Sequence, residues 1–79
     1  MPRYFFNTAD GHRDCDEEGV ELPNGDAARV EAIRYAGAVL NDHPDILWDG
    51  RDFRVEVVNE DEQLVCTVIT LAVDTPEIC

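Results

Sequence analysis

The sequence contains neither lysine nor serine, and each absence excludes a class of chemistry. Six arginines carry all of the positive charge against 18 acidic residues, so the formal net charge is −12. Without serine there is no serine nucleophile, and there is no glycine-rich loop of the kind that holds phosphate. So acidic a chain repels nucleic acid phosphates and anionic membrane surfaces, and we expect it to bind neither.

Long apolar runs and a disulfide framework are missing too. No stretch approaches the ~18 apolar residues of a transmembrane helix, and the opening residues lack the apolar segment of a secretory signal. The three cysteines, Cys15, Cys66 and Cys79, are odd in number and have no framework spacing, which is typical of reduced thiols. These features predict a cytoplasmic protein.

What the chain does contain predicts one small α+β domain spanning residues 1–79, with a loose tail at 74–79. Hydrophobic residues make up 44% of the 79, enough for a globular domain with a thin core. The predicted elements are a strand at 3–8, a return strand at 13–15 after an Asp-Gly turn, an extended piece at 20–22, a helix from 25 to about 42, and strands at 53–57 and 63–71. The two terminal hairpins are expected to form one antiparallel sheet, β-β-α-β-β, with the helix packed on one face.

The helix has clear ends. Asn24 is a suitable N-cap, and Pro44 prevents continuation beyond His43. A 3-4-3 spacing predicts the face that packs on the sheet: Val30, Ile33, Gly37 and Leu40. Gly37 is expected to allow a close approach of the helix to the sheet.

Several segments together resemble a family of short acidic bacterial proteins that is known as a domain of unknown function. They are the opening Met1-Pro2-Arg3-Tyr4-Phe5-Phe6, the Gly19-Val20-Glu21-Leu22-Pro23 segment before the helix, and an alanine-rich helix followed by two apolar strands. The sequence departs from the family at Asn7, where histidine is usual, and at Asn24, where aspartate is usual. The resemblance implies a bacterial, cytoplasmic protein and carries no activity, cofactor or catalytic residue.

An acidic turn is the first candidate site. Asp14, Asp16 and Glu18 precede Gly19 in the pattern that opens a calcium loop, and His12 lies beside them. The pattern then fails, because Gly25 stands where the bidentate glutamate should be. A zinc site built on His12 and Cys15 would need a second close pair of ligands, and Cys66 and His43 are isolated. We therefore predict no cofactor and no metal, with the acidic turn as a weak cation-binding alternative.

The last strand provides the stronger signal. At residues 63–71 both sides are largely apolar, with Leu64, Cys66, Val68 and Thr70 on one side and Val65, Thr67, Ile69 and Leu71 on the other. One helix covers only one face of a sheet, so the second apolar side predicts a covering partner. The predicted interaction surface is Tyr4, Phe6, Val65, Thr67, Ile69, Leu71 and Trp48.

No convergent catalytic set is present, so the sequence favours a non-catalytic interaction or regulatory module that self-associates as a homodimer. An acidic decoy that mimics nucleic acid and occupies a basic protein is the alternative from another class, and it requires one continuous stripe of carboxylates.

Overall fold

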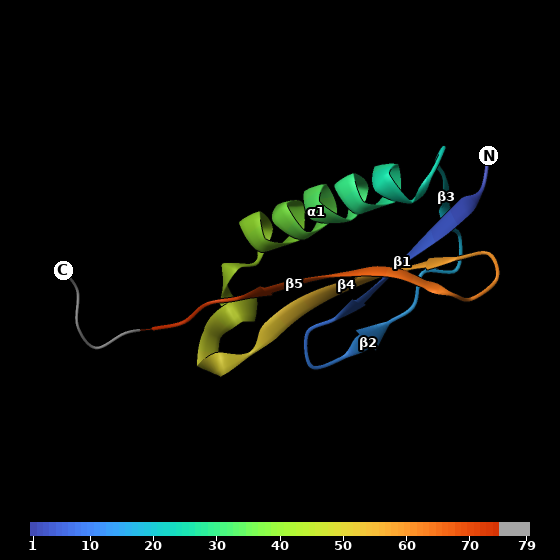
Figure 1. Ribbon diagram of the computed structural model, residues 1–79. Coiled ribbons are helices and arrows are strands. Elements are labelled where there is room, and N and C mark those ends of the chain that lie inside the picture. The colour runs from blue at the N-terminus through green and yellow to red at the C-terminus, as the bar shows by residue number, and fades with distance from the viewer. Residues whose placement is uncertain (75–79) are drawn as a thin grey trace.

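The structure is a computed structural model that describes residues 1–74. One helix covers one face of an antiparallel sheet (Figure 1). The elements in chain order are β1 (Arg3–Ala9), β2 (Arg13–Asp14), β3 (Val20–Glu21), α1 (Gly25–Asp42), the 3-10 segment η1 (Pro44–Gly50), β4 (Asp52–Asn59) and β5 (Leu64–Leu71). The predicted α+β class is confirmed. Of the predicted loose tail at 74–79, all but Asp74 lies outside the described residues.

The sheet has the strand order β2-β1-β4-β5, and β3 pairs with a separate part of β1. The two terminal hairpins therefore share one sheet, as predicted. β4 lies in the middle, antiparallel to both β1 and β5. Its alternate residues Phe53, Val55 and Val57 are almost fully buried, because a central strand has neighbours on both sides and the helix above.

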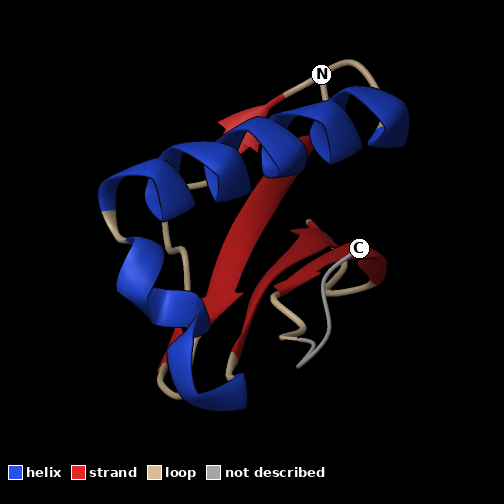
Figure 2. Cartoon of the chain, turned by 90° about the vertical axis from the view of Figure 1, so that its left-hand side faces the viewer, coloured by secondary structure: helices blue, strands red, loops and turns tan. Residues whose placement is uncertain are grey.

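The helix α1 begins and ends where the sequence predicts, and it crosses one face of the sheet (Figure 2). At its start, Asn24 Oδ1 accepts a hydrogen bond from Ala27 N at 2.9 Å, which satisfies one of the free N–H groups of the first turn. At its end, His43 leaves helical geometry with φ −134° and ψ 66°, because the proline that follows disfavours it.

The predicted packing face of α1 is wrong. Val30 and Ile33 are 46% and 53% exposed, and nothing lies within 4 Å of the position that a Cβ on Gly37 would occupy. Of the predicted stripe, only Leu40 packs against the core. The buried stripe consists instead of three alanines spaced four residues apart: Ala28, Ala32 and Ala36. Small side chains let the helix approach the sheet closely, and the large residues of β4 fill the space between them.

A bulge in the last hairpin changes which side chains of β5 face the helix. Opposite the buried residues of β4 lie Cys66, Val68 and Thr70, so these point toward α1, and Thr67, Ile69 and Leu71 point away. The register shifts between Val57 and Val58, which leaves Val65 as the extra residue. Val65 Cγ1 lies 3.3 Å from the position of a Cβ on Gly25, so Val65 is on the helix side rather than with Thr67 as predicted.

Candidate functional site

The two edges of the sheet differ in whether their backbone groups have partners. The first, which we call the closed edge, is β1 together with β2, β3 and the segment between them. The β3 strand pairs with Arg3 and Tyr4, and β2 pairs with Thr8 and Ala9. The gap between these two short pairings is covered by Asp16.

Asp16 closes the middle of this edge with its side chain and its backbone. Its Oδ2 accepts a hydrogen bond from Phe6 N at 3.2 Å, and its own N–H donates to Asn7 Oδ1 at 2.9 Å. Its Oδ1 accepts from the N–H groups of Glu18 and Gly19 at 3.1 and 3.2 Å. One carboxylate thus holds both the edge of β1 and the turn that leads to β3.

The ionised form of Asp16 is the form that these hydrogen bonds favour. Burial acts to raise the pKa of the Asp16 carboxyl, but the N–H donors of Gly19, Phe6 and Glu18 together outweigh it, and the pKa lies below its usual value. The predicted role of Asp16 as a calcium ligand competes with this one, because the same oxygens already serve the backbone.

Gly19 completes the closed edge by making room for it. Its φ is +72°, and a Cβ at this position would lie 2.8 Å from the backbone oxygen of Tyr4 and 2.9 Å from the side chains of Arg3 and Phe5. The turn therefore presses directly on β1, in a left-handed conformation that glycine adopts without strain.

The second edge, which we call the open edge, is β5. Within residues 1–74 it pairs with β4 alone, so every second residue directs its N–H and C=O groups away from the sheet. Its eight residues carry no charge, in a chain that is 30% charged. Ile69 and Leu71 are 52% and 58% exposed on the side away from α1. The strand β5 has no charged residue or proline, and within residues 1–74 no further strand pairs with it, so the usual protection of edge strands is missing there.

The predicted interaction residues are divided among different surroundings. Tyr4 is 7% exposed and belongs to the core, so it is not a surface residue; the strand alternation turns Phe5 outward in its place. Phe6 is partly buried on the helix side. Trp48 is 68% exposed in η1, which packs against β4 and β5. Only three of the predicted residues share the outer side of the open edge: Thr67, Ile69 and Leu71.

Sequence reasoning missed apolar residues that extend the open edge. Leu64 and Val73 are strongly exposed at its two ends. Ile33 of α1 is separated by two residues from Glu31 and from Tyr35. Two residues correspond to a rotation of about 200°, so Ile33 points to the flank of the helix opposite to those two side chains. Since those two residues line a groove beside β1, Ile33 lies on the flank toward β5. The missed signal was the alanine stripe, which fixes the rotation of the helix.

A groove lies on the other flank of α1, over the part of β1 that the helix leaves uncovered. It consists of two adjoining hollows of about 370 and 330 Å³. Both hollows are lined by Thr8, Asp14 and Tyr35. The first also contains Phe6, Cys15, Asp16, Val20 and Glu31, and the second Asp10, Val39, His43, Asp45, Ile46 and Phe53.

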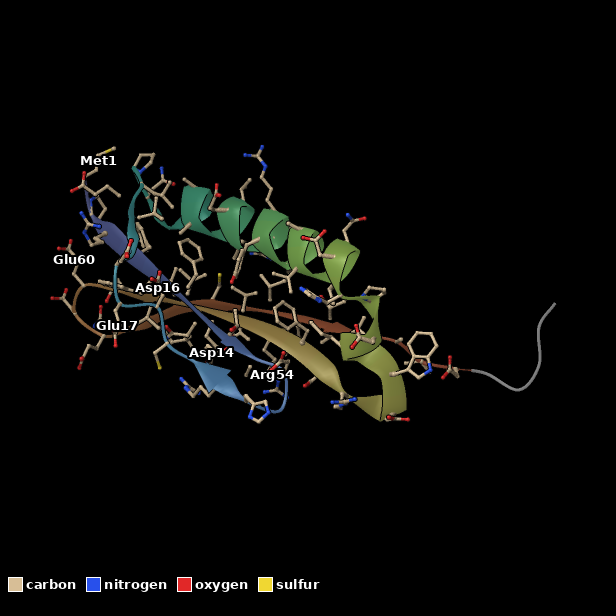
Figure 3. All side chains as sticks on the ribbon, turned by 180° about the vertical axis from the view of Figure 1, so that it is seen from behind. Met1, Asp14, Asp16, Glu17, Arg54 and Glu60 are labelled. Carbon is tan, nitrogen blue, oxygen red and sulfur yellow. The ribbon has the colours of Figure 1, made fainter. Side chains whose placement is uncertain are left out.

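The weak metal candidates do not converge. Among residues 1–74, no group of three or more histidine, cysteine or acidic side chains is placed to hold a metal ion. His12 N donates to Asp10 Oδ1 at 3.3 Å within the first turn. Asp14 and Asp16 both line the groove, and Figure 3 shows them along the closed edge. Glu18 is exposed, and its backbone oxygen accepts from Arg3 Nη1 at 2.8 Å.

Positive charges stand among the carboxylates on the uncovered face of the sheet. Arg13 Nη2 of β2 lies 2.8 Å from Glu56 Oε1 of β4. That oxygen is buried, and the positive charge of the guanidinium compensates its burial. Arg54 Nε donates to Asp52 Oδ2 at 2.9 Å on the same strand. No helix in residues 1–74 has the length and apolar character needed to cross a membrane.

Comparison with known proteins gives one family. Searches of curated proteins and of solved structures returned no match. A family model described as a domain of unknown function, DUF6894, matches residues 3–72. This range runs from the first residue of β1 to just beyond β5, and it includes both edges and the groove. The chain therefore belongs to the DUF6894 family, a domain of unknown function.

Proposed function

We propose that the protein is a non-catalytic interaction module that self-associates through its open edge. The observation that carries this proposal is the contrast between the two edges. The edge of β1 is closed by two short strands and Asp16, whereas the outer edge of β5 pairs with no strand within residues 1–74. Unpaired N–H and C=O groups on an edge strand are a template for another strand. The apolar side chains beside them add surface that association would bury.

A second copy of the chain is the partner that the charge distribution favours. Two molecules of net charge −12 repel each other over most of their surface. The β5 strand is the longest uncharged segment of the sheet, and its exposed side chains are all aliphatic: Leu64, Val65, Ile69 and Leu71. Contact through β5 therefore brings the two copies together where like-charge repulsion is smallest.

The geometry of such a dimer follows from symmetry. Antiparallel pairing of β5 with its own copy requires a two-fold axis perpendicular to the sheet, which keeps both α1 helices on the same face. Opposite residues then point to the same face, so an axis at Val68 places Thr67 of one copy beside Ile69 of the other. The two sheets become one continuous antiparallel sheet.

The decoy alternative receives less support from the structure. Mimicry of nucleic acid needs an uninterrupted row of negative charge. On the uncovered face, the guanidinium groups of Arg13 and Arg54 lie within 3 Å of carboxylates on β4, and they interrupt such a row.

Sedimentation velocity over micromolar to near-millimolar concentrations tests the proposal. We expect a reversible monomer–dimer equilibrium that strengthens as salt is added, because salt screens the repulsion between the two acidic copies. The double variant Thr67→Lys with Ile69→Lys should be monomeric throughout, since the pairing brings the added lysines opposite one another.

A matched control adds the same two charges elsewhere. Val30→Lys with Asn41→Lys changes two exposed positions of α1. This variant should dimerise at least as well as the unmodified chain, because its net negative charge is smaller in magnitude. Monomeric unmodified protein at every concentration would contradict the proposal, as would a dimer that survives the lysines on β5.

A further inference from the structure

We infer that the groove between α1 and β1 binds an extended basic segment of another protein, with its arginine or lysine side chains on the acidic rim and its apolar side chains on the floor. The groove lies on the flank of α1 opposite to the open edge. It is independent of self-association, so either proposal can fail while the other stands.

The floor of the groove is apolar and partly aromatic. The ring of Phe6 rises from β1, Val20 closes one end from β3, and Tyr35 forms part of the wall from α1. Val20 and Tyr35 are 44% and 43% exposed. Aromatic side chains offer a large apolar contact area, and a hollow of about 370 Å³ has room for a large apolar side chain.

The rim is acidic on both walls. Asp14 comes from β2 and Glu31 from α1, and they line the same hollow. Neither carboxylate forms an ion pair within residues 1–74, where four arginines pair with other acids. Their negative charge is therefore available to a cationic ligand. Asp45 adds a further carboxylate in the second hollow.

The shape favours a segment of chain over a small amine. The two hollows share three lining residues, Thr8, Asp14 and Tyr35, and so form one continuous groove along α1 from β3 to η1. An extended chain advances roughly 3.3 Å per residue and alternates its side chains. It would direct alternate residues to the floor and to the rim, whereas a polyamine has no apolar side chains for the floor.

A labelled octapeptide of alternating arginine and leucine is the probe, and fluorescence anisotropy measures its binding. We expect saturable binding that weakens as salt is added, the opposite of the salt effect on self-association. The variant Asp14→Asn with Glu31→Gln should weaken binding about fivefold or more, since exposed ion pairs contribute modestly each. Adding Tyr35→Ala to this double variant should weaken binding of the peptide further.

The control for lost charge is Asp42→Asn with Asp61→Asn, which removes two exposed carboxylates that do not line the groove. It should bind the peptide nearly as well as the unmodified protein. Equal loss in both double variants would show only general attraction between opposite charges, and would overturn the inference.

Two further probes complete the test. The same peptide with citrulline in place of arginine keeps the shape and removes the charge, so it should bind much more weakly. Spermine carries the charge without apolar side chains, and it should bind more weakly than the peptide. Undiminished binding of either, or no binding of the arginine peptide at millimolar protein, would overturn the inference.

Discussion

The closed edge and the open edge are made from the same kind of strand, and they differ in what the neighbouring sequence supplies. Beside β1, the segment from Arg13 to Glu21 provides two short strands and the Asp16 carboxylate. Beside β5, the described part of the chain supplies β4 as the only paired strand, while α1 and η1 pack against β5 without pairing with its edge. Unpaired backbone groups on an edge strand are a template for a further strand.

The largest expected effect comes from breaking the closed edge at Gly19. Gly19→Ala forces a side chain into the left-handed region and against the backbone oxygen of Tyr4. We expect the free energy of unfolding to fall by about 2–4 kcal/mol, measured by urea denaturation of dilute protein. Gly50→Ala is the control, because Gly50 has φ +74° with nothing within 4 Å and should lose only about 1 kcal/mol. Equal losses would show that the turn does not press on β1.

Asp16→Asn should open the same edge and lower the free energy of unfolding by a smaller amount, about 1–2 kcal/mol near neutral pH. The reason is that an amide replaces a carboxylate that accepts three hydrogen bonds. The pKa of Asp16 is lowered in the folded state. Its contribution to stability is therefore present above the carboxyl pKa of the unfolded chain and is lost as pH falls through the lower, folded pKa.

The difference in unfolding free energy between the unmodified chain and Asp16→Asn should thus shrink as pH falls below about 4. A difference is the right quantity, since acidification also relieves the repulsion among 18 acidic residues. Glu17→Gln, an exposed neighbour, should show little difference at any pH. A difference for Asp16→Asn that stays constant down to pH 2 would contradict the role of its ionised form.

The smallest effect on the isolated protomer is expected at the open edge. Thr67 and Ile69 lie on the outer side of β5. For the variant Thr67→Lys with Ile69→Lys, thermal melting of dilute protein should show a change of about 0.5 kcal/mol or less in the free energy of unfolding. A large loss would mean that these side chains support the fold itself, and the reading of β5 as a surface would then be wrong.

Local signals in the sequence were enough to predict the strands, α1 and the two hairpins, but not the face of α1 that contacts the sheet. Asn24 and Pro44 set the ends of α1 because capping and the missing N–H of proline act within one turn. Alternation set β4 because its buried side faces the core at every second residue. The face of α1 was missed because hydrophobicity favours Val30 and Ile33 over alanine. The helix instead contacts the sheet through its smallest side chains, the three alanines.

The candidate site was predictable in part, for similar reasons. The doubly apolar composition of β5 drew attention to Ile69 and Leu71, which are more than half exposed in the structure. Their role in association stays a prediction. The side on which Val65 lies was missed, because a bulge within a run of apolar residues has no distinct signal in the sequence. Asp16 resembled a solvated or calcium-binding residue, since its partners Phe6 and Gly19 are brought to it only by the pairing of β1 and β3.

Amide hydrogen exchange, followed residue by residue at low and high protein concentration, tests the central contrast most directly. We predict that alternate amides of β5 exchange quickly in dilute protein and slow markedly at high concentration, while the amide of Phe6, held by Asp16, is protected equally at both. Outward amides of β5 that exchange at the same rate at every concentration would contradict self-association through the open edge.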